Sequence, residues 1–159
     1  MSDARWTDVL EDARQAAEHF ARSVQLYEAG GFLGDDLDAY RARMAFMHAV
    51  QSGHTSLEAA LLRVFEILGE ERPSGDQWHR DLISRAARAM PGDSGRPPIL
   101  TEDLGGHADE TRRFRNLATR SYGTFDPARA RSTVIAAKTL SSNLLPALLS
   151  FQEVVDPPQ

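Results

Sequence analysis

The sequence predicts an all-α protein, folded as an antiparallel bundle of four to five helices. Apolar residues recur at steps of three and four along most of the chain, the spacing that lines one face of a helix. Glycine and proline interrupt these runs at intervals, and no run of alternating β-branched residues bounded by turns is found. Long helices joined by short loops favour antiparallel neighbours, so the pattern predicts a bundle without a sheet.

The two longest helices open the chain. The first is predicted over residues 3–29 and ends at Gly30-Gly31, because glycine after the last periodic residue is the usual end of a helix. The second is predicted over residues 36–68. Ser52-Gly53 lies in its middle, where glycine costs up to about 1 kcal/mol relative to alanine, so we expect one helix that can kink there.

A shorter third helix follows the break at Arg72-Pro73. It is predicted to begin at Ser74 or Asp76, either of which can cap a helix, and to end near Met90. Residues 91–98, with the sequence PGDSGRPP, form a turn-rich loop. This loop separates the third helix from the arginine-rich part of the chain.

The last two helices are predicted from their capping residues. Thr101 is a plausible N-cap for a fourth helix that runs toward Ser121. Asp126-Pro127 is expected to start the final helix, since aspartate caps helix N-termini and proline fits the first helical position. Pro146 lies inside this helix and predicts a kink.

Composition indicates one soluble, cytoplasmic domain. The 159 residues are 42% hydrophobic and 26% charged, and we expect one domain over residues 1–153 with a flexible tail over residues 154–159. Cysteine is absent, which excludes disulfides and fits a reducing compartment. The N-terminus lacks a signal-like pattern, and no segment approaches the roughly 20 apolar residues of a membrane span. We therefore expect neither secretion nor a membrane partner.

Several enzyme classes lack their motifs in this sequence. There is no Gly-rich phosphate loop, no Gly-x-Ser-x-Gly elbow and no His-Glu-x-x-His pattern. Di-metal carboxylate bundles need Glu-x-x-His pairs, whereas the only close pair here is Glu18-His19. We therefore expect neither a cofactor nor a metal site.

Residues 111–131 form a basic segment in an acidic chain. The formal net charge is −5 at pH 7, which disfavours general coating of nucleic acid. Asp126 is nevertheless the only acid of this segment, whereas its arginines are Arg112, Arg113, Arg115, Arg120, Arg129 and Arg131. This asymmetry points to an anionic partner.

The first four of these arginines are the candidate phosphate-binding residues, because forked guanidinium donors match phosphate oxygens. Pairing with acids one turn earlier in the helix accounts for Arg112 and Arg113. It leaves Arg115 and Arg120 unassigned, and for these two a solvated helix face and an anion-binding role remain open.

The segment TRRFRNLATRSYGTFD resembles the end of the third main helix of HEPN domains, in particular the HepT-like ribonuclease toxins. Their motif is arginine, a polar residue, three more residues, histidine, one residue and tyrosine. Arg115, Asn116 and Tyr122 fall at this spacing. Further similarities, which together with the helix layout cover most of the chain, are Phe114 before the motif, Gly123 after it, and the upstream pair Trp78-His79.

The resemblance implies a homodimer whose two sites face each other across a two-fold cleft, and metal-independent cleavage of RNA. In that reaction the 2′-hydroxyl attacks its own phosphorus, histidine moves protons and arginine stabilises the phosphorane. Arg115, Asn116 and position 120 would form the catalytic site. Tyr122 would be the residue that a minimal nucleotidyltransferase antitoxin modifies with AMP; the alternative is an ordinary amphipathic tyrosine at a helix end.

The sequence departs from the family at Arg120, which stands where the motif has histidine. A guanidinium has a pKa above about 12 and no lone pair that accepts a proton near neutral pH, so Arg120 cannot move protons. It can still hold phosphate. We therefore expect binding of RNA or a nucleotide at a degenerate ribonuclease site, with little or no cleavage.

Two other histidines could supply the missing base. His107 precedes Arg115 by eight residues on the same predicted helix, about 12 Å away, and could reach the site only across an interface. His79 lies on another helix and cannot be placed from sequence. Three function classes therefore remain: an RNA- or nucleotide-binding relative of the toxins, an active endoribonuclease toxin, and a bundle that serves only protein association.

Overall fold

Five helices make up the regular structure of residues 3–120 and 125–159, the part of the chain that the computed structural model describes; the side chains of residues 119 and 120 are outside it. The helices are α1 (Trp6–Ala29), α2 (Leu37–Leu68), α3 (Trp78–Ala86), α4 (Glu102–Arg120) and α5 (Arg131–Val155). Within these ranges the only β-type pairing is a single bridge between Met90 and Arg96. The predicted all-α bundle is confirmed.

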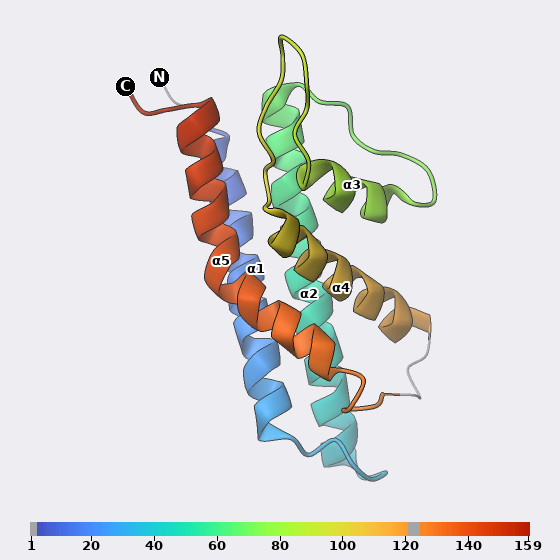
Figure 1. Cartoon of the computed structure of the whole chain (residues 1–159). Helices are drawn as coiled ribbons and strands as arrows, with labels where there is room; N and C mark the ends of the chain where they lie inside the picture. Colours follow the sequence, from blue (N-terminus) through green and yellow to red (C-terminus); the bar gives the residue numbers. More distant parts are fainter. Residues whose placement is uncertain (1–2, 121–124) are drawn as a thin grey trace.

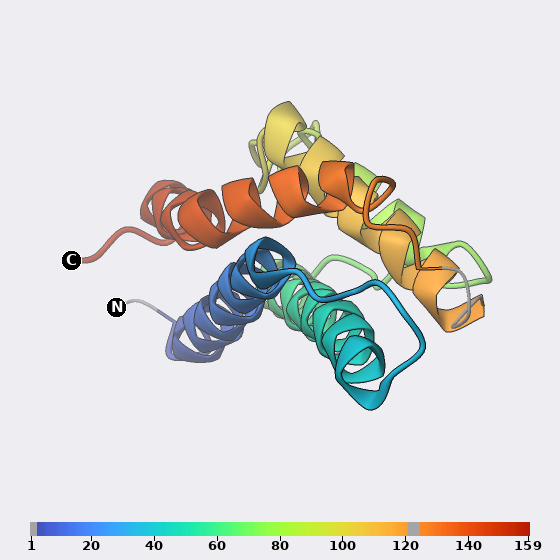
Figure 2. The same ribbon diagram turned by 90° about the horizontal axis from the view of Figure 1, so that it is seen from below.

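The helices form two layers (Figures 1 and 2). The long pair α1 and α2 runs antiparallel in one layer, and α4 and α5 cross over it in the other. The short helix α3 packs against α2 and α4. The two ends of the chain lie close together, and the Asp3 backbone N–H donates to Asp156 Oδ2 over 2.6 Å.

Two apolar clusters hold the layers together. The larger one gathers the predicted stripes of all five described helices, including Trp6, Leu61 and Leu144, which are fully or almost fully buried. The smaller one is aromatic, centres on Phe46, and lies where the C-terminal half of α4 meets α1 and α2. Burial of each such side chain contributes roughly 1.5–3 kcal/mol, so the clusters fix how the helices cross.

Gly53 marks a close approach of two helices, whereas the sequence had suggested a kink. The helix α2 runs unbroken from Leu37 to Leu68. A Cβ atom at position 53 would lie 2.8 Å from the Phe20 ring on α1. The glycine is therefore needed because α1 and α2 pack tightly here.

The third helix is shorter than predicted at both ends. It begins at Trp78 after Gln77, so neither Ser74 nor Asp76 caps it, and it ends at Ala86 instead of near Met90. The backbone N–H groups of Ile99 and Leu100 both donate to the Ala86 carbonyl, the group that would continue the helix by accepting from Met90. Met90 pairs with Arg96 instead. Thr101 caps α4 as predicted, since its Oγ1 accepts from the Leu104 N–H over 3.1 Å.

The predicted start of the last helix at Asp126-Pro127 is also wrong. Asp126 caps only a single turn: its Oδ1 accepts from the Ala128 N–H and its carbonyl accepts from the N–H groups of Arg129 and Ala130. The helix α5 begins at Arg131. Figure 1 shows α5 bent near its middle, and Pro146, which removes a backbone donor, lies inside this helix.

By length and mean hydropathy α5 could also span a membrane, the one such helix among the described residues. A core helix passes the same test, and α5 contributes Leu140, Leu144 and Leu148 to the larger cluster. Its last turn reaches Val155, slightly beyond the expected domain end at residue 153.

Candidate functional site

The motif arginine of α4 meets a buried glutamate of α2. Thr111 and Arg115 are one turn apart on α4, and His54 and Glu58 are one turn apart on α2, so each pair lies on one face of its helix. Where the helices cross, His54 Nδ1 lies 2.8 Å from Thr111 Oγ1, and Arg115 donates to Glu58 Oε1 over 2.9 Å.

Aromatic packing sets the position of this part of α4. Phe114, the residue before Arg115, makes an edge-on contact with Phe46 of α2 at a centroid distance of 5.5 Å. Phe125 contacts the same ring, also at 5.5 Å. Because Phe114 is held against α2, the next residue is held beside Glu58.

The third member of this site is His79 of α3. Its Nδ1 lies 2.5 Å from Glu58 Oε2, so Glu58 uses one oxygen for the histidine and the other for Arg115. The imidazole stacks on the Trp78 ring at a centroid distance of 3.7 Å. We call His54, Glu58, His79, Thr111 and Arg115 the Glu58 cluster.

Glu58 carries a negative charge in a buried position. Only 5% of its side chain is exposed, and this burial by itself raises the pKa of the carboxyl group. The neighbouring His54 and His79 rings have the larger combined influence, and they hold the pKa of Glu58 below its usual range. The carboxylate is therefore ionised at neutral pH.

His54 plays a different part from His79. It is fully buried, and burial lowers the pKa of its imidazole despite the nearby Glu58 carboxylate. His54 Nδ1 lies 2.8 Å from the Thr111 hydroxyl oxygen, and this hydroxyl also donates to the Ala108 carbonyl over 2.9 Å. His54 Nε2, 3.5 Å from Glu58 Oε2, is buried without a hydrogen bond in the described structure. The neutral His54 ring thus braces the helix crossing and is out of reach of a ligand.

His79 has the arrangement of a general base. Glu58 accepts from Nδ1–H, which in the neutral ring leaves the lone pair on Nε2. About 30% of the His79 side chain is exposed, so the ring is accessible from solvent. In the sequence, Trp78-His79 was only one of the similarities to the family. The fold brings His79 close to the motif arginine, Arg115, through Glu58.

The other predicted residues are placed as follows. Arg112 pairs with Asp109 over 2.7 Å, and Arg113 pairs with Asp109 and Glu110, as the helical spacing predicted. Asn116 is exposed. Arg120 ends α4 but its side chain is outside the described part, and Tyr122 lies outside the described residues altogether.

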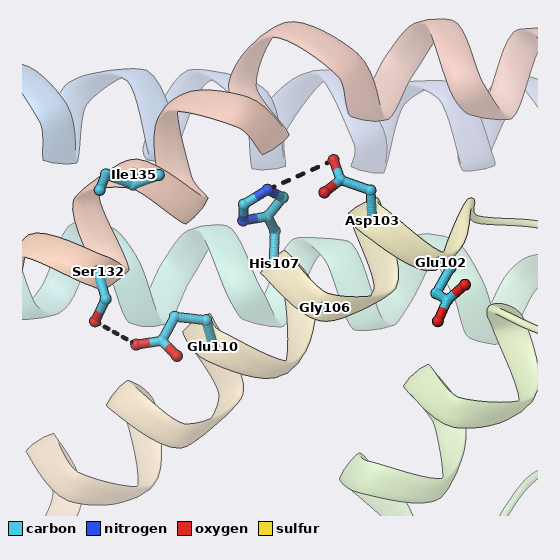
Figure 3. Close-up of a pocket in the computed structure, with 7 residues that line it drawn as sticks. All are labelled: Glu102, Asp103, Gly106, His107, Glu110, Ser132 and Ile135. Atoms are coloured by element: carbon cyan, nitrogen blue, oxygen red, sulfur yellow. Dashed lines mark hydrogen bonds and ion pairs between the residues drawn. The ribbon is translucent and has the colours of Figure 1, made fainter.

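His107 lies in an acidic groove of about 630 Å³ between α4 and α5. Figure 3 shows His107 turned toward Asp103, with 3.6 Å between Nε2 and Oδ2, while Ser132 bonds Glu110 on the other side. Three carboxylates line the groove, which we call the acidic groove; its lining residues are Glu102, Asp103, Gly106, His107, Glu110, Ser132 and Ile135. His107 therefore lies in a negative environment, separate from Arg115.

Sequence reasoning missed Glu58 and His54. The one available signal was their spacing, since His54 and Glu58 stand one turn apart on α2. Groups of three or more potential metal ligands that could hold an ion are not found among the described residues.

A family model described as "HepT-like protein" matches residues 45–155, a range that includes the whole Glu58 cluster. No curated protein matches the chain, and no solved structure does.

Proposed function

The chain belongs to the HepT-like family of HEPN proteins, and from this premise we propose that it is the toxin-side component of a toxin–antitoxin pair. In this proposal it is a cytoplasmic homodimer that binds RNA or a nucleotide through Arg115 and Arg120. Arg120 supplies charge where the family motif has a proton-transfer group.

The observation that supports this proposal is the setting of Arg115. Its guanidinium is anchored on Glu58 over 2.9 Å, yet 29% of the side chain stays exposed. Anchoring removes side-chain freedom before a ligand arrives, so less entropy is lost on binding. A fixed, partly exposed guanidinium suits phosphate recognition.

The same ion pair favours a second candidate, a bundle that serves only protein association. Arg115 is engaged within its own protomer, as expected if its role is structural. A structural clamp, however, has no need of a partly exposed histidine on the other oxygen of Glu58. We therefore place RNA or nucleotide binding first.

Fluorescence anisotropy with a mixed-sequence single-stranded oligoribonucleotide tests the binding. Arg115→Ala and Arg120→Ala should each weaken binding about tenfold or more, because a charged hydrogen bond contributes about 1.5–3 kcal/mol. Arg14→Ala is the matched control, since Arg14 is an exposed arginine of α1 in a helical ion pair. Affinity should also fall with salt, by about 0.7 log units per log unit of salt for each phosphate contact. No binding at low salt, in a protein that still assembles, would favour the association candidate.

The partner in this proposal is a minimal nucleotidyltransferase that transfers AMP to Tyr122. Co-expression of the chain with a nucleotidyltransferase encoded beside it should add one AMP, detected by intact mass spectrometry. Tyr122→Phe should abolish the addition, whereas Tyr40→Phe should not, since Tyr40 is an exposed tyrosine of α2. Analytical ultracentrifugation checks the homodimer in the same preparations.

A further inference from the structure

We propose that His79, held by Glu58, is the catalytic base of this site and replaces the motif histidine that is absent at position 120. The inference rests on the proposed RNA function and extends it from binding to cleavage. It would make the chain an active, metal-independent endoribonuclease, in contrast to what position 120 alone suggests.

The first argument is placement. Glu58 Oε1 accepts from Arg115 and Glu58 Oε2 accepts from His79, so a proton acceptor and a phosphate-binding cation are attached to the two ends of one carboxylate. The three consecutive helices α2, α3 and α4 contribute one residue each to this arrangement. Arg115 and His79 are therefore neighbours across a single carboxylate group.

The second argument is electrostatic. Glu58 is ionised and nine-tenths or more buried, so its charge acts in an environment of low dielectric constant. When Nε2 accepts a proton, the new imidazolium faces this carboxylate through Nδ1–H and is stabilised by it. The same carboxylate fixes the ring tautomer, as the buried acid does in a catalytic triad.

The third argument is the setting of the ring. The stacked Trp78 limits rotation of the imidazole, and Trp78 itself packs on the larger apolar cluster. The other titratable and charged groups described around His79 are His54 on α2, which is neutral and buried, and Arg115 on α4. Among the described residues, His79 alone combines exposure, a fixed tautomer and a neighbouring motif arginine.

The reaction balances without an additional reagent. His79 Nε2 takes the proton of a ribose 2′-hydroxyl, the O2′–P bond forms and the P–O5′ bond breaks. Arg115 stabilises the negative charge that develops on the phosphoryl oxygens. The leaving 5′-oxygen takes a proton from water, His79 returns its proton to solvent, and the products are a 2′,3′-cyclic phosphate and a 5′-hydroxyl end. Glu58 is a positioning residue because it acts through His79 and Arg115.

Cleavage of a mixed-sequence single-stranded oligoribonucleotide in excess chelator tests the inference. Wild type should release 2′,3′-cyclic phosphate ends. His79→Asn keeps a donor for Glu58 but removes the base, so the rate should fall about 10²- to 10⁴-fold while RNA affinity stays unchanged. His107→Asn is the matched control and should cleave at the wild-type rate. Arg120→His should restore part of the activity when it is added to His79→Asn.

Glu58→Gln distinguishes positioning from a purely structural role. Without the carboxylate the tautomer and orientation of the His79 ring are no longer fixed, so kcat should fall with little change in KM. A structural role would change KM together with kcat, because Glu58 also holds Arg115. Circular dichroism of each variant shows that the helices remain folded.

The outcomes separate the two proposals. Full activity in His79→Asn, or loss of RNA affinity together with activity, overturns the assignment of His79. Binding without any cleavage by wild type also overturns it, and leaves the proposed binding function in place. Absence of both binding and cleavage would show that the proposed function itself is wrong.

Discussion

The Glu58 cluster and the acidic groove each contain a histidine beside a carboxylate. They differ in the burial of that carboxylate, in its distance from the histidine and in the charge of the neighbouring residues. In the groove, the Asp103 side chain is 80% exposed and lies 3.6 Å from His107 Nε2. In the cluster, Glu58 is buried and lies 2.5 Å from His79 Nδ1. The groove adds two more carboxylates, whereas the cluster adds Arg115.

By this contrast the Glu58 cluster suits an anionic ligand better than the acidic groove, although the groove is a larger hollow. A phosphate in the acidic groove would meet several negative charges and no described arginine among the lining residues. A phosphate at the cluster would meet a guanidinium already fixed in place. Variants that act differently in the two regions can therefore break or sharpen the comparison.

The largest difference between the two regions is expected in the free energy of unfolding when the carboxylate of each is removed. Glu58→Ala should lower the free energy of unfolding by about 3 kcal/mol, because it leaves partly buried cationic and polar partners without their carboxylate. Asp103→Ala should change it by less than about 0.5 kcal/mol, since this carboxylate is exposed. Urea unfolding measures both, and equal losses would contradict the contrast.

Two helical glycines should respond in opposite directions. Gly53 precedes His54 and Gly106 precedes His107. Gly53→Ala should lower stability by about 1–3 kcal/mol, because its Cβ would meet the Phe20 ring at 2.8 Å. Gly106→Ala should raise stability by up to about 1 kcal/mol, since nothing lies within 4 Å and alanine favours the helix. Thermal unfolding of both variants checks the signs; a stabilising Gly53→Ala would mean that α1 and α2 are less tightly packed.

A smaller effect is expected from pH. Burial lowers the pKa of His54 below 6.5 in the folded state, so below pH 6.5 the unfolded chain binds a proton that the folded chain does not. The contribution of neutral His54 to the free energy of unfolding is fully present above pH 6.5. It is lost as the pH falls, with a slope of at most about 1.4 kcal/mol per pH unit.

Urea unfolding between pH 7.5 and 5.5 measures this slope and stays above the range in which Glu58 takes up a proton. His54→Asn, which keeps a donor toward Thr111 but does not titrate, should flatten the dependence. An unchanged pH dependence in His54→Asn would contradict this assignment.

Much of the fold followed from the sequence because helix periodicity is a local signal. The stripes and the cap at Thr101 were predicted, and so was the break after the first helix. The C-terminal end of α3 was not predicted, because backbone groups from the following loop compete for the Ala86 carbonyl. The start of α5 was not predicted either, because the Asp126 cap supports only one turn. Such competition cannot be read from neighbouring residues.

The arrangement of the candidate site could be predicted only in part. The motif spacing identified Arg115, since the motif is contained within one helix. Glu58 and His79 come from α2 and α3, and their meeting with Arg115 depends on how the helices cross. That crossing is set by contacts such as Phe20 on Gly53 and Phe114 on Phe46, which join residues separated widely in the sequence.

The histidine side-chain NMR signals of the full chain, recorded while a 2′-O-methyl oligoribonucleotide is added, test most directly which region is the RNA site. This probe binds but lacks the 2′-hydroxyl that would be attacked, so binding is observed without cleavage. Substitution of each histidine in turn assigns the signals. If the Glu58 cluster is the site, the His79 ring signals shift on binding and those of His107 stay in place. A shift of the His107 signals with those of His79 unchanged would contradict it.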